Sequence, residues 1–535
     1  MAVADGADTN AGGNQIEVEA GEQTCNAKHL APGWTICVCN SNSIDSCGRL
    51  QFAWPQSSGT LLRVTTSKSG RRFETTRLDG TRNRYGAKDK GVEASELRIN
   101  LNDEKQTVLG WGGALTDAAL FNINNLSSEL SQQVLESYYG RDGLQYNFVR
   151  VPIAGTDFSI RKYSYDDIAD DSVPDYNLQK WALAPEDTHL KIPYLKRIAQ
   201  IVVNDGLPEI KHLATPWSPP KWMKDNKSFI RGHLTASEKI YRAYAKYLVK
   251  FFLTYREHGI EFWGSTIQNE PIAAFFPHYF FNSLEMGPSE MIDFIGNYLG
   301  PELERHNYTK ANFKLIVGDD SLGFDNFLVP PVMKDPKVQK YVSGIAFHWY
   351  TSGIIPYSFL STMINEVRDT IEFALMTEAC EGSFGANRGV LLGNWDRGAN
   401  YAADIIQDLL HSAGGWIDWN LALDPSGGPT WADNRVDSPI IVDYKKNEFY
   451  KQPMYYTLAH FSRLFTPGSV RVGTDLKSRN LMAVAVHKKD TGHLIVNILN
   501  SANSNQKLSV TIAGSKKQFV TVVEPHSLNS LIYKI

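Results

Sequence analysis

Between Leu109 and Asn420 the sequence alternates short β-branched or aromatic runs with stretches of helical periodicity. This alternation is typical of βα units, in which each helix returns the chain to the next parallel strand. Eight such runs occur, at residues 108–112, 147–151, 210–215, 262–268, 314–318, 344–348, 373–377 and 415–419. Eight is the strand number of a (β/α)8 TIM barrel, so we expect an α/β fold built on that barrel.

Two of the intervening helices are clear. The first has apolar residues every four positions over 126–138 and stops at Gly140. The second has Thr235 and Glu238 as an N-terminal capping box, an apolar face over 240–255 and Gly259 as its stop. Both precede a predicted strand, as a βα barrel requires.

The two ends of the chain contain short β-rich runs without helical periodicity. The C-terminal runs are too few for a sandwich, so we expect one β-sandwich from residues 50–107 plus 469–535. The segment 421–452, rich in Pro, Gly, Asp and Asn, is predicted to pair with residues 25–48 in a small sheet. The barrel then comprises 108–420 plus 453–468, and residues 1–24 form an N-terminal extension that we expect to be disordered.

The overall composition excludes several classes of protein. The chain has 535 residues, 42% of them hydrophobic, with 54 Lys plus Arg against 58 Asp plus Glu. These values exclude a disordered, collagen-like or strongly basic nucleic-acid-binding chain, so no nucleic acid partner is expected. No run approaches the roughly 18 apolar residues of a membrane span. Residues 1–24 are polar and acidic, and no signal peptide is visible among them.

Four of the five cysteines lie in one short segment, at Cys25, Cys37, Cys39 and Cys47. They form either two disulfides or a zinc site, and the scarcity of C-x-x-C spacing favours disulfides and an oxidising compartment. Three Asn-x-Ser/Thr sequons fit a secreted or lumenal glycoprotein, at Asn125, Asn226 and Asn307.

Two carboxylates follow predicted barrel strands, where the active site of a TIM barrel is built. Glu270 follows the fourth run and Glu378 the seventh. Paired carboxylates flanking a glycosidic bond can hydrolyse it, one as proton donor and the other at the oxocarbenium-like centre. The alternative for either Glu alone is a solvated loop residue or a partner of an arginine. The amide of Asn269 could bind a sugar 2-hydroxyl.

Other strand ends add polar and aromatic side chains, which favours a sugar pocket because indoles stack on pyranose rings. For a lone Trp or His, core packing is the alternative. These residues are Arg150, Asp157, Phe158, Trp217, His348 to Tyr350 and Asp418 to Asn420.

Six segments resemble glycoside hydrolase family 30, and in particular its glucosylceramidases: residues 110–119, 269–271, 378–380, 395–398, 415–423 and 436–443. The resemblance runs in order from about Cys25 to the C-terminus. It implies a (β/α)8 barrel with a β-sandwich and a small disulfide-bearing antiparallel sheet. It also implies retaining hydrolysis of glucosylceramide to glucose and ceramide, without a cofactor or metal.

The resemblance also assigns roles to single residues. Glu270 would be the acid/base and Glu378 the nucleophile. Cys25 would pair with Cys37 and Cys39 with Cys47, leaving Cys380 as a free thiol. The substrate would contact Asp157, Phe158, Trp217, Asn269, Phe281, Tyr350, Trp419 and Asn434.

Two loops at the predicted barrel mouth, 275–281 and 349–359, are unusually apolar. They are predicted to contact an anionic membrane surface and acyl chains, or alternatively to pack on each other as a lid. The resemblance implies a lysosomal or secreted protein, peripheral on the lumenal membrane, with a saposin-type activator as a further partner. The loops 275–281, 353–359 and 381–390 depart from the mammalian enzymes.

Two other functions compete with this one. Another retaining β-glycosidase of the same fold, a xylanase or glucanase, has no need of an apolar mouth. A noncatalytic carbohydrate- or lipid-binding relative has no need of both Glu270 and Glu378.

Overall fold

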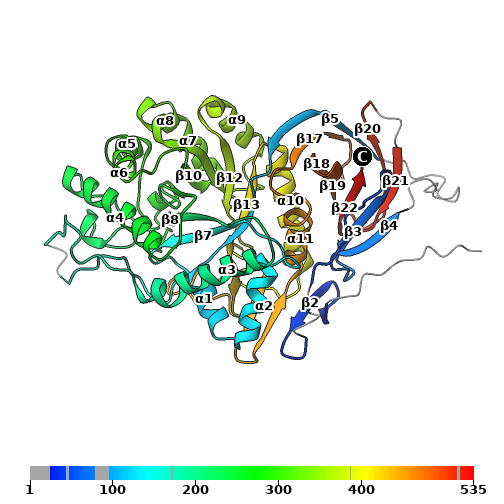
Figure 1. Ribbon diagram of the computed structural model, residues 1–535, viewed down its shortest axis with the longest axis horizontal. Helices are drawn as coiled ribbons and strands as arrows, with labels where there is room; N and C mark the ends of the chain where they lie inside the picture. The colour runs from blue at the N-terminus through cyan, green and yellow to red at the C-terminus, as the bar shows by residue number, and fades with distance from the viewer. Residues whose placement is uncertain are drawn as a thin grey trace, which may run out of the picture.

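The computed structural model describes residues 25–43, 47, 49–78, 95–169, 173–385, 387–514 and 518–535, so the expected extension 1–24 lies outside the described residues. Eight parallel strands close into a barrel in the order β10-β11-β12-β13-β6-β7-β8-β9, which confirms the predicted TIM barrel (Figure 1). The strands are β6 (Gly110–Ala114), β7 (Phe148–Ile153), β8 (Lys211–Pro216), β9 (Gly264–Thr266), β10 (Lys314–Ser321), β11 (Val342–His348), β12 (Phe373–Glu378) and β13 (Gly415–Asn420).

Each predicted run overlaps one barrel strand, but the lengths differ. The fourth run, 262–268, contains only the three-residue β9, because the chain turns away at Ile267 to bring Glu270 over the barrel. The interior is filled by apolar side chains from six strands, which accounts for the β-branched and aromatic runs. These side chains are Phe148, Leu213, Ile316, Ala346, Leu375 and Ile417.

Helices surround the barrel (Figure 1). In α2, Ser127 caps the first turn by accepting a hydrogen bond from the backbone N–H of Leu130. The capping box predicted for α4 is wrong: the cap position is Ser237, and Glu238 is already helical and instead pairs with Arg242. The helices are α1 (Asp117–Asn124), α2 (Ser128–Tyr139), α3 (Ile192–Asn204), α4 (Glu238–Glu257), α5 (Pro288–Asp293), α6 (Gly300–Arg305), α7 (Leu322–Met333), α8 (Pro336–Tyr341), α9 (Ser358–Val367), α10 (Trp395–Leu410) and α11 (Pro453–Ser462).

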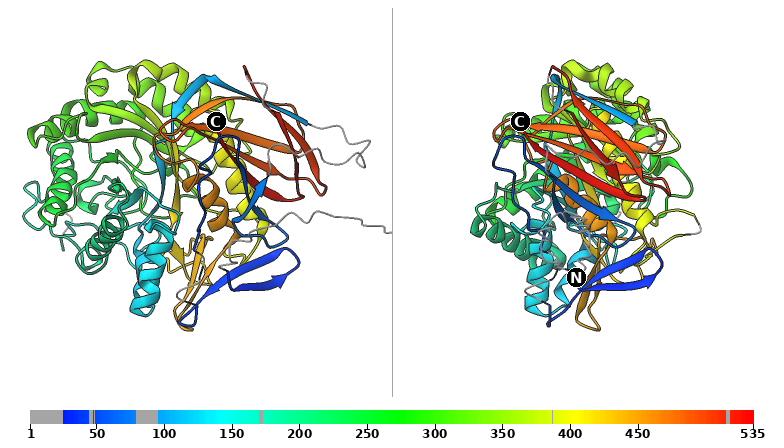
Figure 2. Two further views of the ribbon diagram at one scale, coloured as in Figure 1. Left: turned by 45° about the vertical axis from the view of Figure 1, so that its right-hand side comes forward. Right: turned by 90° about the vertical axis from the view of Figure 1, so that its right-hand side faces the viewer.

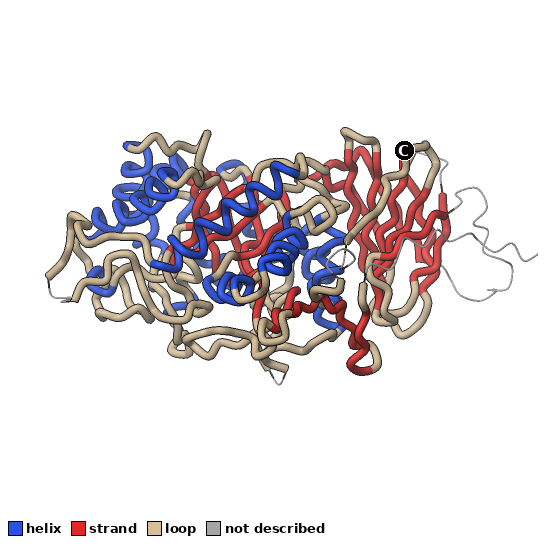
Figure 3. The backbone as a smooth tube through the Cα atoms, turned by 60° about the horizontal axis from the view of Figure 1, so that its bottom comes forward, coloured by secondary structure: helices blue, strands red, loops and turns tan. Residues whose placement is uncertain are grey.

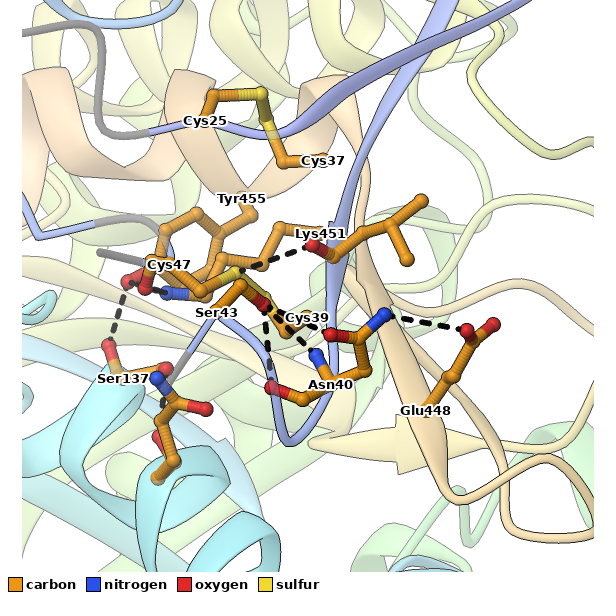
Figure 4. The surroundings of a disulfide bond; sticks show 12 residues. Cys25, Cys37, Cys39, Asn40, Ser43, Cys47, Ser137, Glu448, Lys451 and Tyr455 are labelled. Atoms are coloured by element: carbon orange, nitrogen blue, oxygen red, sulfur yellow. Dashed lines mark hydrogen bonds between the residues drawn. A yellow bond between two sulfur atoms is a disulfide. The ribbon is translucent and has the colours of Figure 1, made fainter. Parts of the chain in front are cut away.

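A five-stranded sheet joins the N-terminal segment to the excursion after the last barrel strand. Its order is β1 (Ala27–Ala31), β2 (Trp34–Cys39), β16 (Glu448–Lys451), β15 (Ile440–Asp443) and β14 (Ala422–Leu423). All pairs are antiparallel except β14 with β15. Two disulfides lie beside β2, joining Cys25 to Cys37 and Cys39 to Cys47 (Figure 4). The four clustered cysteines are thus held as disulfides, and Cys380 is a buried free thiol.

The remaining strands form a nine-stranded sheet that draws on both ends of the chain (Figures 2 and 3). Apolar residues of its strands form a separate core, as in a β-sandwich. The order is β21 (Gln518–Val523), β20 (Gln506–Ile512), β5 (Ser95–Thr107), β17 (Val470–Leu476), β18 (Leu481–Lys488), β19 (His493–Asn500), β22 (Ser527–Lys534), β3 (Leu61–Ser67) and β4 (Glu74–Leu78). Helices α10 and α11 lie between this sheet and the barrel (Figure 1).

Candidate active site

Glu270 and Glu378 lie at the C-terminal end of the barrel, where βα loops build active sites. Glu378 is the last residue of β12, and Glu270 follows β9 in a left-handed backbone conformation with φ of 46°. This conformation costs a residue other than glycine about 1 kcal/mol or more. The backbone N–H of Glu270 donates to the carbonyl oxygen of Asp319 at 2.9 Å, which holds the turn.

The two carboxylates face each other across a cavity of about 430 Å³. One oxygen of Glu270, one oxygen of Glu378 and one ring nitrogen of His348 all lie within 4.8 Å of one another. Carboxyl groups of retaining glycosidases are about 5 to 5.5 Å apart, whereas inverting enzymes need roughly 6.5 to 9.5 Å to admit water. The close approach of the two carboxylates favours a retaining pair.

Asp319, at the end of β10, connects the two sides of the site. Its carboxylate pairs with Arg150 at 3.0 Å and with His348 at 3.2 Å, and it accepts a hydrogen bond from Thr377 at 2.6 Å. Arg150 in turn donates to Glu378 and, at 2.8 Å, to the side-chain oxygen of Asn269. The Nδ1 atom of His348 lies 3.1 Å from Glu270.

Buried charges set the protonation of this network. Burial disfavours the charged form of His348, but Glu378, Asp319 and Glu270 outweigh it and raise the pKa to about 10. Burial raises the pKa of Glu378, His348 and Arg150 oppose that rise, and the facing Glu270 adds to it. Glu270, His348 and Glu378 are also close enough together to hold a metal ion, but in this network the His348 nitrogens instead contact the carboxylates of Glu270 and Asp319.

Two tyrosines hold the carboxylates from opposite loops. Tyr350 donates to Glu378 at 2.8 Å, and Tyr279 donates to Glu270 at 2.6 Å. The ring of Phe281 packs on that of Tyr279 with centroids 4.2 Å apart, and both line the cavity. Each of the two facing carboxylates therefore accepts hydrogen bonds that fix its orientation.

Aromatic and polar side chains form the sugar-sized floor of the cavity. Trp217 and Trp419 stack at 5.1 Å, with the guanidinium of Arg150 over both rings. Asn434 donates to Asp157 at 2.8 Å. Burial raises the pKa of Asp157 to about 8, Asn434 opposes this, and the charges of Glu378 and Glu270 add to it.

Most of the predicted substrate contacts line this cavity: Asp157, Trp217, Asn269, Phe281, Tyr350, Trp419 and Asn434. Phe158 does not line it, because its fully buried ring packs edge-on behind Trp419 at 6.0 Å. Sequence reasoning missed Arg388, which also lines the cavity and donates to Asn434 at 3.2 Å.

The apolar loops supply side chains both to the cavity and to the surface around it, and Phe276 and Phe280 belong to both. Tyr279, Phe281 and Tyr350 turn inward, and Trp349 packs edge-on against Tyr401 at 5.2 Å. The apolar rim, which we define as six side chains with exposed fractions from 40% to 79%, consists of Phe275, Phe276, Phe280, Ile354, Phe359 and Phe384. Within the described residues, no helix is both long enough and apolar enough to cross a bilayer.

Comparisons with known proteins agree with this geometry. Residues 108–465 match the Glycosyl hydrolase family 30 TIM-barrel domain, and residues 468–531 match the Glycosyl hydrolase family 30 beta sandwich domain. The chain is 37% identical to the lysosomal acid glucosylceramidase of Mus musculus over 528 residues, which cover 96% of each chain. It is 26% identical to an endo-1,6-beta-D-glucanase of Trichoderma harzianum, over 68% of this chain and 71% of that one.

Among solved structures, SrfJ from Salmonella typhimurium superimposes with a TM-score of 0.77 at 23% identity, covering 89% of this chain and 100% of that chain. This likeness concerns the fold alone. The barrel and its facing carboxylates define the class, which is that of the glycoside hydrolases. Within that class, the chain belongs to glycoside hydrolase family 30.

Proposed function

We propose that this chain is a retaining β-glucosidase that hydrolyses glucosylceramide to glucose and ceramide. The observation that carries this proposal is the close approach of Glu270 and Glu378, within 4.8 Å at the barrel mouth. The mouse relative is named a glucosylceramidase, and this similarity supports the lipid substrate. The apolar rim is a feature that a polysaccharide cleft does not need.

In the first step, Glu378 attacks the anomeric carbon while Glu270 protonates the leaving oxygen, giving a covalent glucosyl-enzyme and ceramide. The guanidinium of Arg150 contacts Glu378 and favours its carboxylate form, which suits Glu378 to the role of nucleophile. In the second step, Glu270 takes a proton from water, which attacks the glucosyl-enzyme and releases β-glucose.

The pocket floor binds the glucose. Trp217 and Trp419 supply apolar faces for the ring, while Asp157 and Asn434 bind hydroxyl groups. Asn269 reaches the 2-hydroxyl, where a hydrogen bond strengthens in the oxocarbenium-like transition state. Arg150 fixes the side-chain oxygen of Asn269, which directs its N–H groups into the cavity.

The apolar rim would lie on an anionic lipid surface, so that the protein acts as a peripheral membrane enzyme, with a saposin-type protein as activator. The lysosome is the proposed compartment, supported by the mouse lysosomal relative and by the two disulfides. All three sequon asparagines, Asn125, Asn226 and Asn307, are exposed, and we propose them as glycosylation sites.

Azide rescue tests the two catalytic roles through the stereochemistry of the product. With 4-methylumbelliferyl β-glucoside, Glu378→Gly should lose activity, and azide should restore it by direct displacement, giving the α-glucosyl azide. Glu270→Ala should still form the glucosyl-enzyme, because this leaving group needs little protonation, and azide should then give the β-glucosyl azide. If Glu378→Gly gave the β-glucosyl azide and Glu270→Ala the α-glucosyl azide, the two residues would have the opposite roles. If azide rescued neither variant, the double-displacement mechanism would be contradicted.

A further inference from the structure

The segment Arg231 to His233 lies against both ends of one loop of the site. This acid/base loop, residues 273–285, follows Glu270 and carries Tyr279 and Phe281. At its start, Arg231 Nε donates to the carbonyl oxygen of Ala274 at 3.3 Å, and the His233 ring meets the Phe275 ring edge-on at 5.3 Å.

The other end of the acid/base loop is held by the same segment. The backbone N–H of Arg231 donates to the Ser283 hydroxyl at 2.8 Å, and Gly232 exchanges two hydrogen bonds with Glu285, at 2.9 and 3.0 Å. One short segment therefore closes the base of the loop that positions Tyr279 over Glu270.

His233 makes the charged contacts of this closure. Its Nδ1 lies 3.0 Å from one carboxylate oxygen of Glu290, in α5, and its Nε2 lies 3.2 Å from Glu285. A carboxylate only accepts hydrogen bonds, and a neutral imidazole has one nitrogen that cannot donate. The Nδ1 contact is a hydrogen bond and the Nε2 contact is a close approach, and together they place the His233 ring between the carboxylates of Glu290 and Glu285.

Other charged and polar groups surround the His233 ring. Arg231 lies 3.3 Å from Glu285, and Asp225 accepts the backbone N–H of His233 at 3.0 Å. Glu290 also accepts the N–H of Gly287 at the start of α5, and Tyr241 of α4 faces it from the other side. The His233 side chain is 35% exposed, so its ion pairs are screened by water and add little to global stability. Their effect is on the position of the loop.

We propose that His233 is a positioning residue for the acid/base: its ring, clasped between Glu285 and Glu290, closes the loop that sets Tyr279 against Glu270. This inference rests on the proposed function, because it assigns a role in proton donation. The hydroxyl of Tyr279 reaches Glu270 at 2.6 Å, so a shift of the loop changes the orientation of the proton donor.

The test separates proton donation from the rest of catalysis by the choice of leaving group. His233→Gln is compared with the parent on two soluble substrates, ethyl β-glucoside and 2,4-dinitrophenyl β-glucoside. At pH 5, kcat/KM on the ethyl glucoside should fall about fivefold to tenfold, a small part of the roughly 100-fold or more that general acid catalysis supplies. Cleavage of the dinitrophenyl glucoside needs no proton donor. The glycosylation rate of His233→Gln on this substrate should therefore match that of the parent.

Glu285→Gln, which weakens one side of the clasp, should show a smaller loss of the same kind. His306→Gln is the matched control: His306 pairs with Glu302 at 3.5 Å and is also 35% exposed, but it lies at the end of α6. That control should resemble the parent on both substrates.

Equal losses of His233→Gln on both substrates would overturn the positioning role. A parent that cleaves neither glucoside would instead overturn the proposed function, and this inference with it. Thermal unfolding of each variant at pH 5 identifies a variant that has simply lost its fold, in which case Glu285→Gln decides the question.

Discussion

At the scale of single residues, Asp319 shows how one buried carboxylate can hold two cationic side chains in place. Burial works against its charged form, but Arg150 and His348 outweigh this and lower its pKa below the ordinary value. It remains an anion and holds both cations, one of which contacts Glu378 and the other Glu270. The opposite behaviour of Asp157, whose pKa is raised, reflects the absence of a cation among the groups that shift it.

The raised pKa of Asp157 gives a prediction for sugar binding. Below a pH of about 8 this carboxyl is protonated and can donate a hydrogen bond to a glucose hydroxyl. Above that pH, the ionised carboxylate of Asp157 adds a negative charge to the cavity, and the hydrogen-bond donor is lost. We therefore expect KM for a soluble aryl β-glucoside to rise several-fold between pH 7 and pH 9.

Asp157→Asn is the variant that checks this assignment, because its amide cannot ionise. Its KM at pH 7 should exceed that of the parent, but should not rise further toward pH 9. A parallel rise in both proteins would place the titrating group elsewhere.

The rule that polar residues at strand ends build the site predicted most of its residues, including Glu270, Glu378, Asp157 and Trp217. The same rule missed Asp319 because the fifth strand was expected to end at Gly318, whereas β10 continues to Ser321. Strand ends depend on pairing with both neighbours, which a single segment does not encode. The contact of Arg388 with Asn434 joins two loops far apart in sequence, and no local pattern predicts such a pair.

At the scale of elements, the two apolar loops were predicted as blocks, but each places its side chains in two directions. In the loop after β11, Ile354 is 79% exposed, whereas Ile355 is half-buried and packs near Gly323. Apolar composition located the loops correctly. The direction of each side chain depends on the turn between β11 and α9, which composition does not encode.

The apolar rim predicts different effects on a lipid and on a soluble substrate. Phe276→Ser combined with Ile354→Ser should lower activity on glucosylceramide in anionic vesicles several-fold, because each exposed apolar side chain contributes on the order of 1 to 3 kcal/mol when buried in lipid. Hydrolysis of a soluble aryl glucoside should stay near the parent value. Both activities are measured on the same preparation.

Val203→Ser is the control for the rim, since Val203 is 71% exposed on α3 but is not part of the rim. It should leave both activities unchanged. Equal losses on lipid and soluble substrates in the rim variant would mean that these side chains support the pocket rather than membrane contact.

At the scale of the whole molecule, α11 joins the barrel to the sandwich through a buried histidine. His460 lies 2.7 Å from the Ser530 hydroxyl of β22 and 2.8 Å from the Thr66 hydroxyl of β3. Burial lowers its pKa from 6.5 to about 3, so it remains neutral in the folded protein. The unfolded chain therefore binds a proton at this position in acid that the folded chain does not bind.

This contact predicts a loss of stability in acid. A lowered histidine pKa gives stability that is complete above pH 6.5 and declines as the pH falls toward 3. At pH 5 the loss amounts to about 2 kcal/mol. The free energy of unfolding of His460→Asn, measured by denaturant titration, should decline less between pH 7 and pH 5 than that of the parent, even though the variant is less stable at pH 7. An equal decline in the two proteins would show that His460 is not the group responsible.

The order of strands in the sandwich has a consequence for the synthesis of the chain. Strands β3, β4 and β5 leave the ribosome first, but β3 must wait for β22 and β5 for β17 and β20, which all follow the entire barrel. During translation at about 5 to 20 residues per second, this wait lasts on the order of tens of seconds. Throughout it, the nascent β3–β4 hairpin and β5 expose unpaired strand edges, which are templates for aggregation. A chaperone that shields these early strands would therefore raise the yield of folded enzyme, whereas truncation before β22 would leave the edge of β3 permanently exposed.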